Sequence, residues 1–153
     1  MKFLVLLRHG IAEDPSPEKN DIDRVLTPKG RRRMDAIAAG LARVFPEAEA
    51  IYSSPAVRAM QTAAPVAKQY GLKIQKSDDL APGRPPRKVV GEAGVDFAIF
   101  VGHEPTLSDL MRELTRIDGE IELKKGGCYG IAFDGETARL EWILTPRVLR
   151  RLR

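Results

Sequence analysis

The segment Lys2 to Gly10, KFLVLLRHG, constrains the fold of this chain more than any other. In it, an unbroken apolar run from Phe3 to Leu7 is followed directly by Arg8, His9 and Gly10. A short run of this kind, bounded by charge, predicts a strand that is buried on both faces of a parallel sheet. Functional sites of open α/β sheets lie just beyond the carboxyl ends of such strands. We therefore expect Arg8 and His9 at a site, where Gly10 lets the backbone turn without a Cβ in the way.

The second histidine of the chain stands in the same kind of position. Only two histidines are present, and His103 follows Gly102 and the apolar run from Phe97 to Val101. A single histidine at the end of a strand is more often structural than catalytic. Because both histidines follow predicted buried strands, the pattern predicts that the two imidazoles belong to one site.

The composition bounds the class of protein. A length of 153 residues corresponds to one domain, which we expect to span residues 1–153. The lone Cys128 cannot form an intrachain disulfide, and the N-terminal apolar run is too short for a signal peptide or a membrane-spanning helix. We therefore expect a cytoplasmic protein with no membrane partner. Two histidines and one cysteine so far apart make a poor zinc site, so we expect neither a metal nor a cofactor.

The net positive charge is concentrated at the C-terminus. Residues 146–153 form a basic C-terminal tail with four arginines and no acid, which equals the net charge of +4 of the whole chain. The tail is consistent with a solvated terminal helix or with a contact to an anionic partner. No aromatic residues interleave with its charges, so we do not expect nucleic acid as a partner.

Strands alternate with helices along the chain. The apolar patterns predict strands at residues 3–7, 50–53, 72–75, 97–101, 128–133 and 139–144. They predict helices at about residues 28–45, 55–70, 87–94 and 105–114. Asp134 and Gly135 predict a tight turn between the last two strands. This order predicts an α/β fold, a three-layer α/β/α sandwich with a mostly parallel central sheet and a C-terminal antiparallel hairpin.

After Arg8, Arg58 is the second arginine whose position in the sequence indicates a role at the site. Ser54 and Pro55 predict the cap and first residue of a helix, which places Arg58 in its first turn. A cation is disfavoured there by the helix dipole unless an anion shares the site; a surface salt bridge is the alternative interpretation. Two arginines and two histidines suit a tetrahedral dianion such as phosphate, because the guanidinium fork binds its oxygens bidentately.

Four motifs in the chain resemble those of a known family. They are RHG at 8–10, LTPKG at 26–30, SSPAVRAMQTA at 53–63 and GHEP at 102–105. The motifs resemble those of the histidine phosphatase (phosphoglycerate-mutase-like) superfamily. Their spacing and the small size of the chain resemble the SixA-type phosphohistidine phosphatase branch. The resemblance extends from residue 2 to about residue 144.

This resemblance implies a metal-independent phosphatase with a covalent intermediate. His9 would attack phosphorus and form a phosphohistidine enzyme that water then hydrolyses. Arg8, Gly10, Arg58 and His103 would bind the phosphoryl group. A histidine nucleophile must be neutral, and we expect the charges of Arg8 and Arg58 to lower the pKa of His9.

Departures from the larger family members bear on the substrate. Residues 11–15 lack the polar, asparagine-containing segment of the mutases, and only the 44 residues from 59 to 102 separate Arg58 from His103. This spacing leaves no room for an insertion that supplies a proton donor. Candidate general acids elsewhere are Glu13, Asp14, Asp78 and Asp79.

Because a phosphoramidate needs less help from an acid than an alkyl phosphate does, phosphohistidine on a protein is the leading substrate. A histidine phosphotransfer domain or a similar phosphorylated protein would be the partner. Two alternatives stay open: a broad-specificity small-molecule phosphomonoesterase that uses the same residues, and a non-catalytic phosphoprotein-binding module that uses the basic tail.

Overall fold

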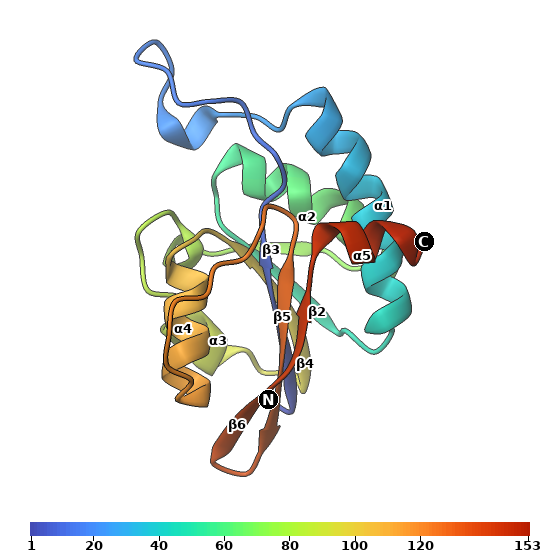
Figure 1. Ribbon diagram of the computed structural model, residues 1–153, viewed down its shortest axis with the longest axis vertical. Helices are drawn as coiled ribbons and strands as arrows, with labels where there is room; N and C mark the ends of the chain where they lie inside the picture. The colour runs from blue at the N-terminus through green and yellow to red at the C-terminus, as the bar shows by residue number, and fades with distance from the viewer.

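The computed structural model describes residues 1–153 and contains one six-stranded sheet between two layers of helices (Figure 1). The strand order is β3-β2-β4-β1-β5-β6. The strands are β1 (Phe3–Arg8), β2 (Ala50–Ser53), β3 (Ile74–Lys76), β4 (Phe97–Gly102), β5 (Cys128–Asp134) and β6 (Thr137–Leu144). Strands β1 to β4 run parallel to one another. Strand β5 is antiparallel to its two neighbours, β1 and β6. The predicted fold class is confirmed.

The helices are divided between the two faces of the sheet. One layer contains α1 (Pro28–Val44), α2 (Val57–Tyr70) and α5 (Pro146–Arg151), and the other contains α3 (Arg87–Glu92) and α4 (Thr106–Thr115). Two short 3-10 helices, η1 (Asp21–Asp23) and η2 (Asp78–Leu80), lie in the loops that follow β1 and β3. None of these helices has the length and apolarity that crossing a membrane requires.

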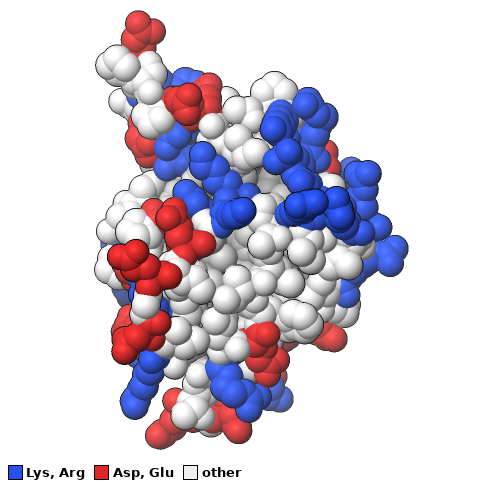
Figure 2. Space-filling model, viewed as in Figure 1, with Lys and Arg blue, Asp and Glu red and all other residues white.

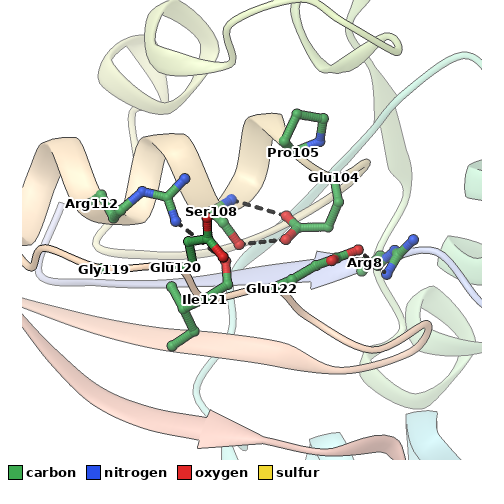
Figure 3. Close-up of a pocket in the computed structure, with 9 residues that line it drawn as sticks. All are labelled: Arg8, Glu104, Pro105, Ser108, Arg112, Gly119, Glu120, Ile121 and Glu122. Atoms are coloured by element: carbon green, nitrogen blue, oxygen red, sulfur yellow. Dashed lines mark hydrogen bonds and ion pairs between the residues drawn. The ribbon is translucent and has the colours of Figure 1, made fainter.

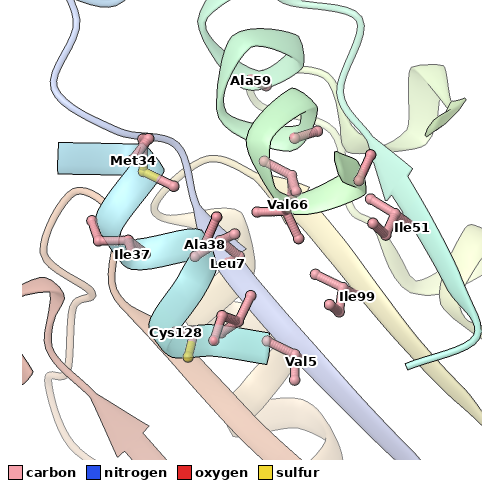
Figure 4. Close-up of a cluster of buried hydrophobic side chains, with 14 of the residues drawn as sticks. Val5, Leu7, Met34, Ile37, Ala38, Ile51, Ala59, Val66, Ile99 and Cys128 are labelled. Atoms are coloured by element: carbon pink, nitrogen blue, oxygen red, sulfur yellow. The ribbon is translucent and has the colours of Figure 1, made fainter. Parts of the chain in front are cut away.

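Strand β1 is buried on both faces, as its apolar run predicts. Val5 and Leu7 pack into the cluster beneath α1 and α2 (Figure 4), and Leu4 and Leu6 pack into the cluster beneath α3 and α4. Successive side chains of a strand point to opposite faces, so a strand covered on both sides must be apolar at every position. This central strand fixes where Arg8 and His9 emerge from the sheet.

Several predicted boundaries differ from the structure: β3 spans Ile74–Lys76 rather than 72–75, β6 begins at Thr137 rather than 139, and α3 ends at Glu92 rather than 94. Helix α2 begins at Val57 rather than Pro55, because Ala56 is its N-cap and the Ser54 hydroxyl is turned toward other partners. The helix then continues through Pro65 to Tyr70. The hairpin turn lies at residues 135–136, since Asp134 still pairs with Thr137 in the ladder.

The basic tail is a docked helix. Residues 146–151 form α5, whose first turn is capped by the Thr145 side chain accepting from the Val148 N–H. Leu149 is fully buried in the core cluster that α1 also lines. The prediction of a solvated terminal helix is therefore wrong for this face of α5, although its arginines remain at the surface.

Gly40 sets the close approach of α1 and α5. A Cβ at this position would lie 1.9 Å from the backbone oxygen of Leu149. Gly40→Ala must therefore push the helices apart, and we expect it to lower the free energy of unfolding by about 2–3 kcal/mol, the upper range for overpacking. Urea denaturation measures the loss. Gly91→Ala in α3 is the matched control, because a Cβ there meets nothing within 4 Å; equal destabilisation of both variants would contradict this explanation.

Candidate active site

The two histidines lie side by side because β1 and β4 are neighbours in register. Arg8 pairs with Gly102, so His9 and His103 follow matched positions at the carboxyl ends of two parallel strands. The His9 N–H donates to the Gly102 carbonyl at 3.1 Å, and the two imidazole centroids are 5.1 Å apart. The structure therefore brings the two imidazoles together at one edge of the sheet.

A cavity of about 310 Å³ brings the candidate residues together. The residues that line it are Arg8, His9, Ala12, Pro15, Arg24, Arg58, Pro82, His103, Glu104 and Lys125. All four side chains expected at the site are present. Gly10 contributes backbone: its N–H donates to Thr62 Oγ1 at 2.9 Å, and a Cβ there would lie 2.8 Å from Met34 Cγ. A side chain is excluded at Gly10 because α1 packs against it.

The hydrogen bonds of His9 determine its tautomer. Its Nδ1 lies 2.7 Å from the Gly10 carbonyl oxygen, which can only accept, so Nδ1 carries the proton. Nε2 makes no hydrogen bond and keeps its lone pair. The pKa of His9 is lowered from 6.5 to about 4, mainly by burial and in smaller part by the charges of Arg58, Arg8 and Lys125, while the hydrogen bond to Gly10 acts in the opposite direction. We expected the arginines to cause this shift, but burial is the larger cause.

His103 is held in the complementary tautomer. Its Nδ1 lies 3.4 Å from Arg58 Nη2, and because a guanidinium only donates, Nδ1 is the acceptor. The proton is then on Nε2, which donates to Ser54 Oγ at 2.8 Å. Burial lowers the pKa of His103 to about 3, with further contributions from His9 and Arg58.

Arg58 is only 3% exposed, so its role is not that of a surface salt bridge. It donates to the backbone oxygen of Asp21 at 2.8 Å and to Asp21 Oδ2 at 3.0 Å. Partial burial of Asp21 raises its pKa, but the charges and hydrogen bonds of Arg58 and Arg24 outweigh this effect, so the pKa of Asp21 is lowered overall. Asp21 therefore anchors the loop after β1 over the cavity through Arg58.

Arg8 reaches toward the other side of the cavity. Its Nη1 donates to the Leu123 carbonyl at 2.5 Å and contacts Glu122 at 3.3 Å. The Nε atoms of Arg8 and Arg58 are both buried and have no hydrogen-bond partner. Since buried donors are normally satisfied, two unpaired guanidinium donors at one cavity are a feature that needs an acceptor.

None of the four predicted general acids lines the cavity. Glu13 is paired with Lys19 at 2.6 Å, and Asp79 with Arg84 at 3.3 Å. Asp14 and Asp78 also lie outside the lining of the cavity. A separate observation concerns metals: no group of three or more His, Cys, Asp and Glu side chains is placed to hold a metal ion.

Glu104 supplies the only carboxylate in the lining of this cavity. Its oxygens accept from the Ser108 N–H at 3.0 Å and the Leu123 N–H at 3.1 Å, and the Ser108 hydroxyl also contacts it. Glu104 and Arg8 line a second cavity of about 660 Å³ between α4 and residues 119–122 (Figure 3). The two cavities therefore share Arg8 and Glu104, and the second is the larger.

Sequence reasoning missed several residues of the site. The sequence predicts Ser54 only as a helix cap, whereas its hydroxyl accepts from His103 and, at 3.2 Å, from the Ala56 N–H. Asp21, Arg24 and Lys125 lie in loops, where no periodicity indicates which side chain turns inward. The motif residue Thr62 does bridge the site, because it accepts from Gly10 and donates to the Arg58 carbonyl at 2.8 Å.

The buried histidines predict a loss of stability on acidification. Their folded-state pKa values of about 4 and about 3 lie below the ordinary 6.5, so the unfolded chain binds more protons below pH 6.5. The free energy of unfolding should fall as the pH drops from 6.5 toward 4, by up to about 1.4 kcal/mol per pH unit for each histidine. Urea denaturation at pH 7, 6 and 5 measures this slope. The double variant His9→Gln/His103→Gln should flatten this slope. An unchanged slope would contradict the assignment of the pH dependence to the two histidines.

A family model and a sequence relative match the chain. The model that describes the histidine phosphatase superfamily (branch 1) matches residues 4–81, which include β1, α1 and α2. The chain belongs to this superfamily. A relative from Picosynechococcus, an uncharacterized protein, is 31% identical over 140 residues, which cover 84% of this chain and 83% of that protein. The prediction of a histidine-type phosphatase is thus confirmed for the family.

Solved structures of histidine phosphatases share the fold. The protein assigned as phosphohistidine phosphatase SixA from Agrobacterium tumefaciens matches with a TM-score of 0.80 at 24% identity, covering 95% of this chain and 98% of that one. The protein histidine phosphatase SixA complexed with tungstate matches with a TM-score of 0.82 at 22% identity, covering 96% and 99%. A mycobacterial glucosyl-3-phosphoglycerate phosphatase matches with a TM-score of 0.74 at 19% identity, covering 94% and 99%. The predicted resemblance to SixA-type enzymes is confirmed in the fold.

Proposed function

We propose that this protein is a SixA-type phosphatase that hydrolyses phosphohistidine on a protein through a covalent intermediate on His9. The observation that carries the proposal is the state of His9: a buried, neutral imidazole with Nδ1 fixed by the Gly10 carbonyl and Nε2 left free at a cavity that Arg8, Arg58 and His103 line. A binding module needs no such nucleophile. The tungstate bound to the related SixA is a tetrahedral oxyanion, which supports the same chemistry.

In the first step, the His9 Nε2 lone pair attacks phosphorus in line with the leaving group. A new P–N bond forms to His9 while the P–N bond of the substrate breaks and its electron pair leaves with the substrate imidazole. Arg8 and Arg58 stabilise the charge on the equatorial oxygens, and their unpaired Nε–H groups are donors that an oxyanion could use. In the second step, water attacks phosphorus and the P–N bond to His9 breaks, with its electron pair returning to Nε2; phosphate departs with the oxygen of water, the protons of water leave with phosphate or pass to solvent, and neutral His9 is restored.

His103 is suited to respond to the phosphoryl group. In the free protein its Nδ1 accepts from Arg58, so it cannot donate from that atom. A dianion beside it would favour the protonated imidazole. Protonated His103 would keep its Nε2–H on Ser54 and donate from Nδ1 to a phosphoryl oxygen. Ser54 would then act by positioning the ring.

The absence of a free carboxylic acid from the cavity lining favours a phosphoramidate substrate. Both oxygens of Glu104, the one carboxylate there, accept hydrogen bonds from backbone N–H groups. An alkoxide leaving group depends on a proton donor, whereas the imidazole of phosphohistidine leaves as a neutral ring when its other nitrogen already carries a proton. The 660 Å³ groove that shares Arg8 provides space for the protein part of the substrate. The buried, unpaired Cys128 agrees with our proposal of a cytoplasmic location.

A small-molecule phosphomonoesterase is the second candidate. The structural similarity to a mycobacterial glucosyl-3-phosphoglycerate phosphatase favours it, because that enzyme is named for a phosphorylated metabolite and was also solved with inorganic phosphate. The side chains of Arg8, His9, Arg58 and His103 would also serve this reaction. The two candidates differ in the leaving group and not in the nucleophile.

Trapping the intermediate tests the proposed chemistry. A phosphotransfer domain carrying ³²P-phosphohistidine is mixed with enzyme and quenched in alkali within the first turnover. We expect label on the wild-type enzyme that is stable to alkali and lost in acid, as a phosphohistidine must be, and none on His9→Ala. Label that persists in the variant would overturn His9 as the nucleophile.

A further inference from the structure

Helices α1 and α5 together form a concave basic surface outside the catalytic cavity. Its five arginines, Arg32, Arg33, Arg150, Arg151 and Arg153, enclose a hollow of about 350 Å³ with Ala36 at its base. We call these five arginines the α1–α5 basic surface. Figure 2 shows Lys and Arg gathered over the side where α1 and α5 lie, and Asp and Glu mainly on the opposite flank.

None of these five arginines has an acidic partner. The arginines elsewhere on the surface are mostly paired, as in Arg24–Asp21, Arg84–Asp79, Arg87–Glu113, Arg112–Asp109 and Arg139–Glu141. Partial desolvation and the charges of Arg33, Arg147 and Arg151 lower the pKa of Arg150, which shows how closely the cations approach. Like charges held together without a counter-charge repel one another, so the surface is complementary to an anionic ligand.

The fold holds this surface in a fixed shape. Leu149 is buried in the core, and Gly40 lets the α5 backbone contact α1, so the arginines of the two helices cannot separate freely. Val148 and Leu152 of α5 remain 45% and 40% exposed beside the arginines. Arginine is enriched at protein–protein interfaces, and the two aliphatic side chains add apolar surface for a partner to cover.

The surface is connected to the catalytic cavity through the loop before β5. Lys125 lines that cavity, and the next residue, Gly126, donates its N–H to the carbonyls of Arg8 and His9 at 3.1 Å. A Cβ on Gly126 would lie 2.8 Å from Ile37 Cδ1 in α1 and 3.5 Å from Pro146 Cβ at the start of α5. A macromolecule that inserts a phosphorylated side chain beside Lys125 is therefore brought close to the start of α5, at Pro146.

We propose that the α1–α5 basic surface docks an acidic face of the phosphorylated protein substrate. The identity of that partner rests on the proposed function. A protein fits these observations better than a bilayer does, because the surface is concave and the same partner must present a side chain to a narrow cavity nearby. Charges at such a rim chiefly affect the association rate and its salt dependence. The reaction itself does not need them.

Binding is tested on His9→Ala enzyme, which cannot turn over. Fluorescence anisotropy measures its affinity for an acidic histidine phosphotransfer domain, phosphorylated and unphosphorylated, at 50 and 200 mM salt. Adding Arg32→Gln, Arg33→Gln, Arg150→Gln and Arg151→Gln should weaken both complexes by about tenfold or more and flatten the salt dependence. The matched control removes four other arginines, with Arg43→Gln, Arg84→Gln, Arg116→Gln and Arg139→Gln, and should bind like the parent.

Each outcome separates the docking proposal from the proposed function. In the enzyme with His9 intact, the quadruple variant should retain turnover of p-nitrophenyl phosphate within twofold and show a raised KM for the phosphorylated domain. Salt-dependent binding through these arginines without phosphate release would support docking and refute phosphohistidine hydrolysis. Release with an unchanged KM would refute docking alone. An equal loss of affinity for the domain in both quadruple variants would also refute docking. So would a wild type that binds anionic vesicles or duplex DNA but does not bind the domain.

Discussion

Substituting His9 by alanine is expected to lower kcat by about 10⁴-fold or more, because the variant has no atom that can accept the phosphoryl group. The imidazole is held for attack before any substrate arrives: Nδ1 is bound to the Gly10 carbonyl, and the pKa of about 4 keeps Nε2 unprotonated at neutral pH. Steady-state release of phosphate from p-nitrophenyl phosphate measures the loss.

His9→Asn is the matched variant for this prediction. An asparagine amide can still donate to the Gly10 carbonyl, so the local backbone should be preserved while the nucleophile is absent. Circular dichroism and urea denaturation should show a folded protein. Turnover by His9→Asn within tenfold of the wild type would contradict the nucleophilic role, because a merely structural histidine would be replaced adequately by a hydrogen-bonding side chain.

Replacing Arg58 by alanine should lower kcat/KM by about 10³-fold, the scale for losing a charged donor to the transition state. Arg58→Lys should recover only part of this loss, since an ammonium cannot bind two oxygens in the way a guanidinium does. Arg58 also contacts His103 at 3.4 Å, so its removal disturbs two of the groups that we propose bind the phosphoryl oxygens. Phosphate release at several substrate concentrations separates kcat from KM.

Asp21→Asn separates the electrostatic role of Arg58 from a structural one. The Asp21 side chain is 56% exposed, and the backbone oxygen of residue 21 also accepts from Arg58, so the guanidinium should remain in place. We expect activity within about tenfold of the wild type, because burial and the hydrogen bond to the backbone oxygen still hold the guanidinium when the Asp21 charge is removed. A loss as large as that of Arg58→Ala would mean that Arg58 serves mainly to hold the loop.

The fold and the central residues could be predicted because their signals are local. The apolar runs before His9 and His103 require burial on both faces of a sheet, and parallel neighbours bring both histidines to one edge. The Thr27–Pro28 pair before α1 is a further local signal, and the Thr27 side chain caps the helix by accepting from the Gly30 N–H. In each case the residues that are adjacent in the sequence are sufficient to predict the local structure.

The remaining features depend on contacts between segments far apart in the chain. Asp21 meets Arg58 across 37 positions, and Ser54 meets His103 across 49. Lys125 reaches the cavity through a loop that has no periodic pattern. The docking of α5 rests on one buried leucine, Leu149, and one close glycine, Gly40, which a count of tail charges cannot reveal. For the same reason, the main cause of the lowered pKa of His9 is its burial, and burial is known only from the packed structure.

The measurement that tests the central claim most directly compares phosphate release from a histidine-phosphorylated phosphotransfer domain with release from p-nitrophenyl phosphate, by the same wild-type preparation. We expect kcat/KM for the protein substrate to exceed that for the ester by at least an order of magnitude, with both activities lost in His9→Ala. Activity on the ester without release from the protein would contradict the claim and identify a small-molecule phosphatase.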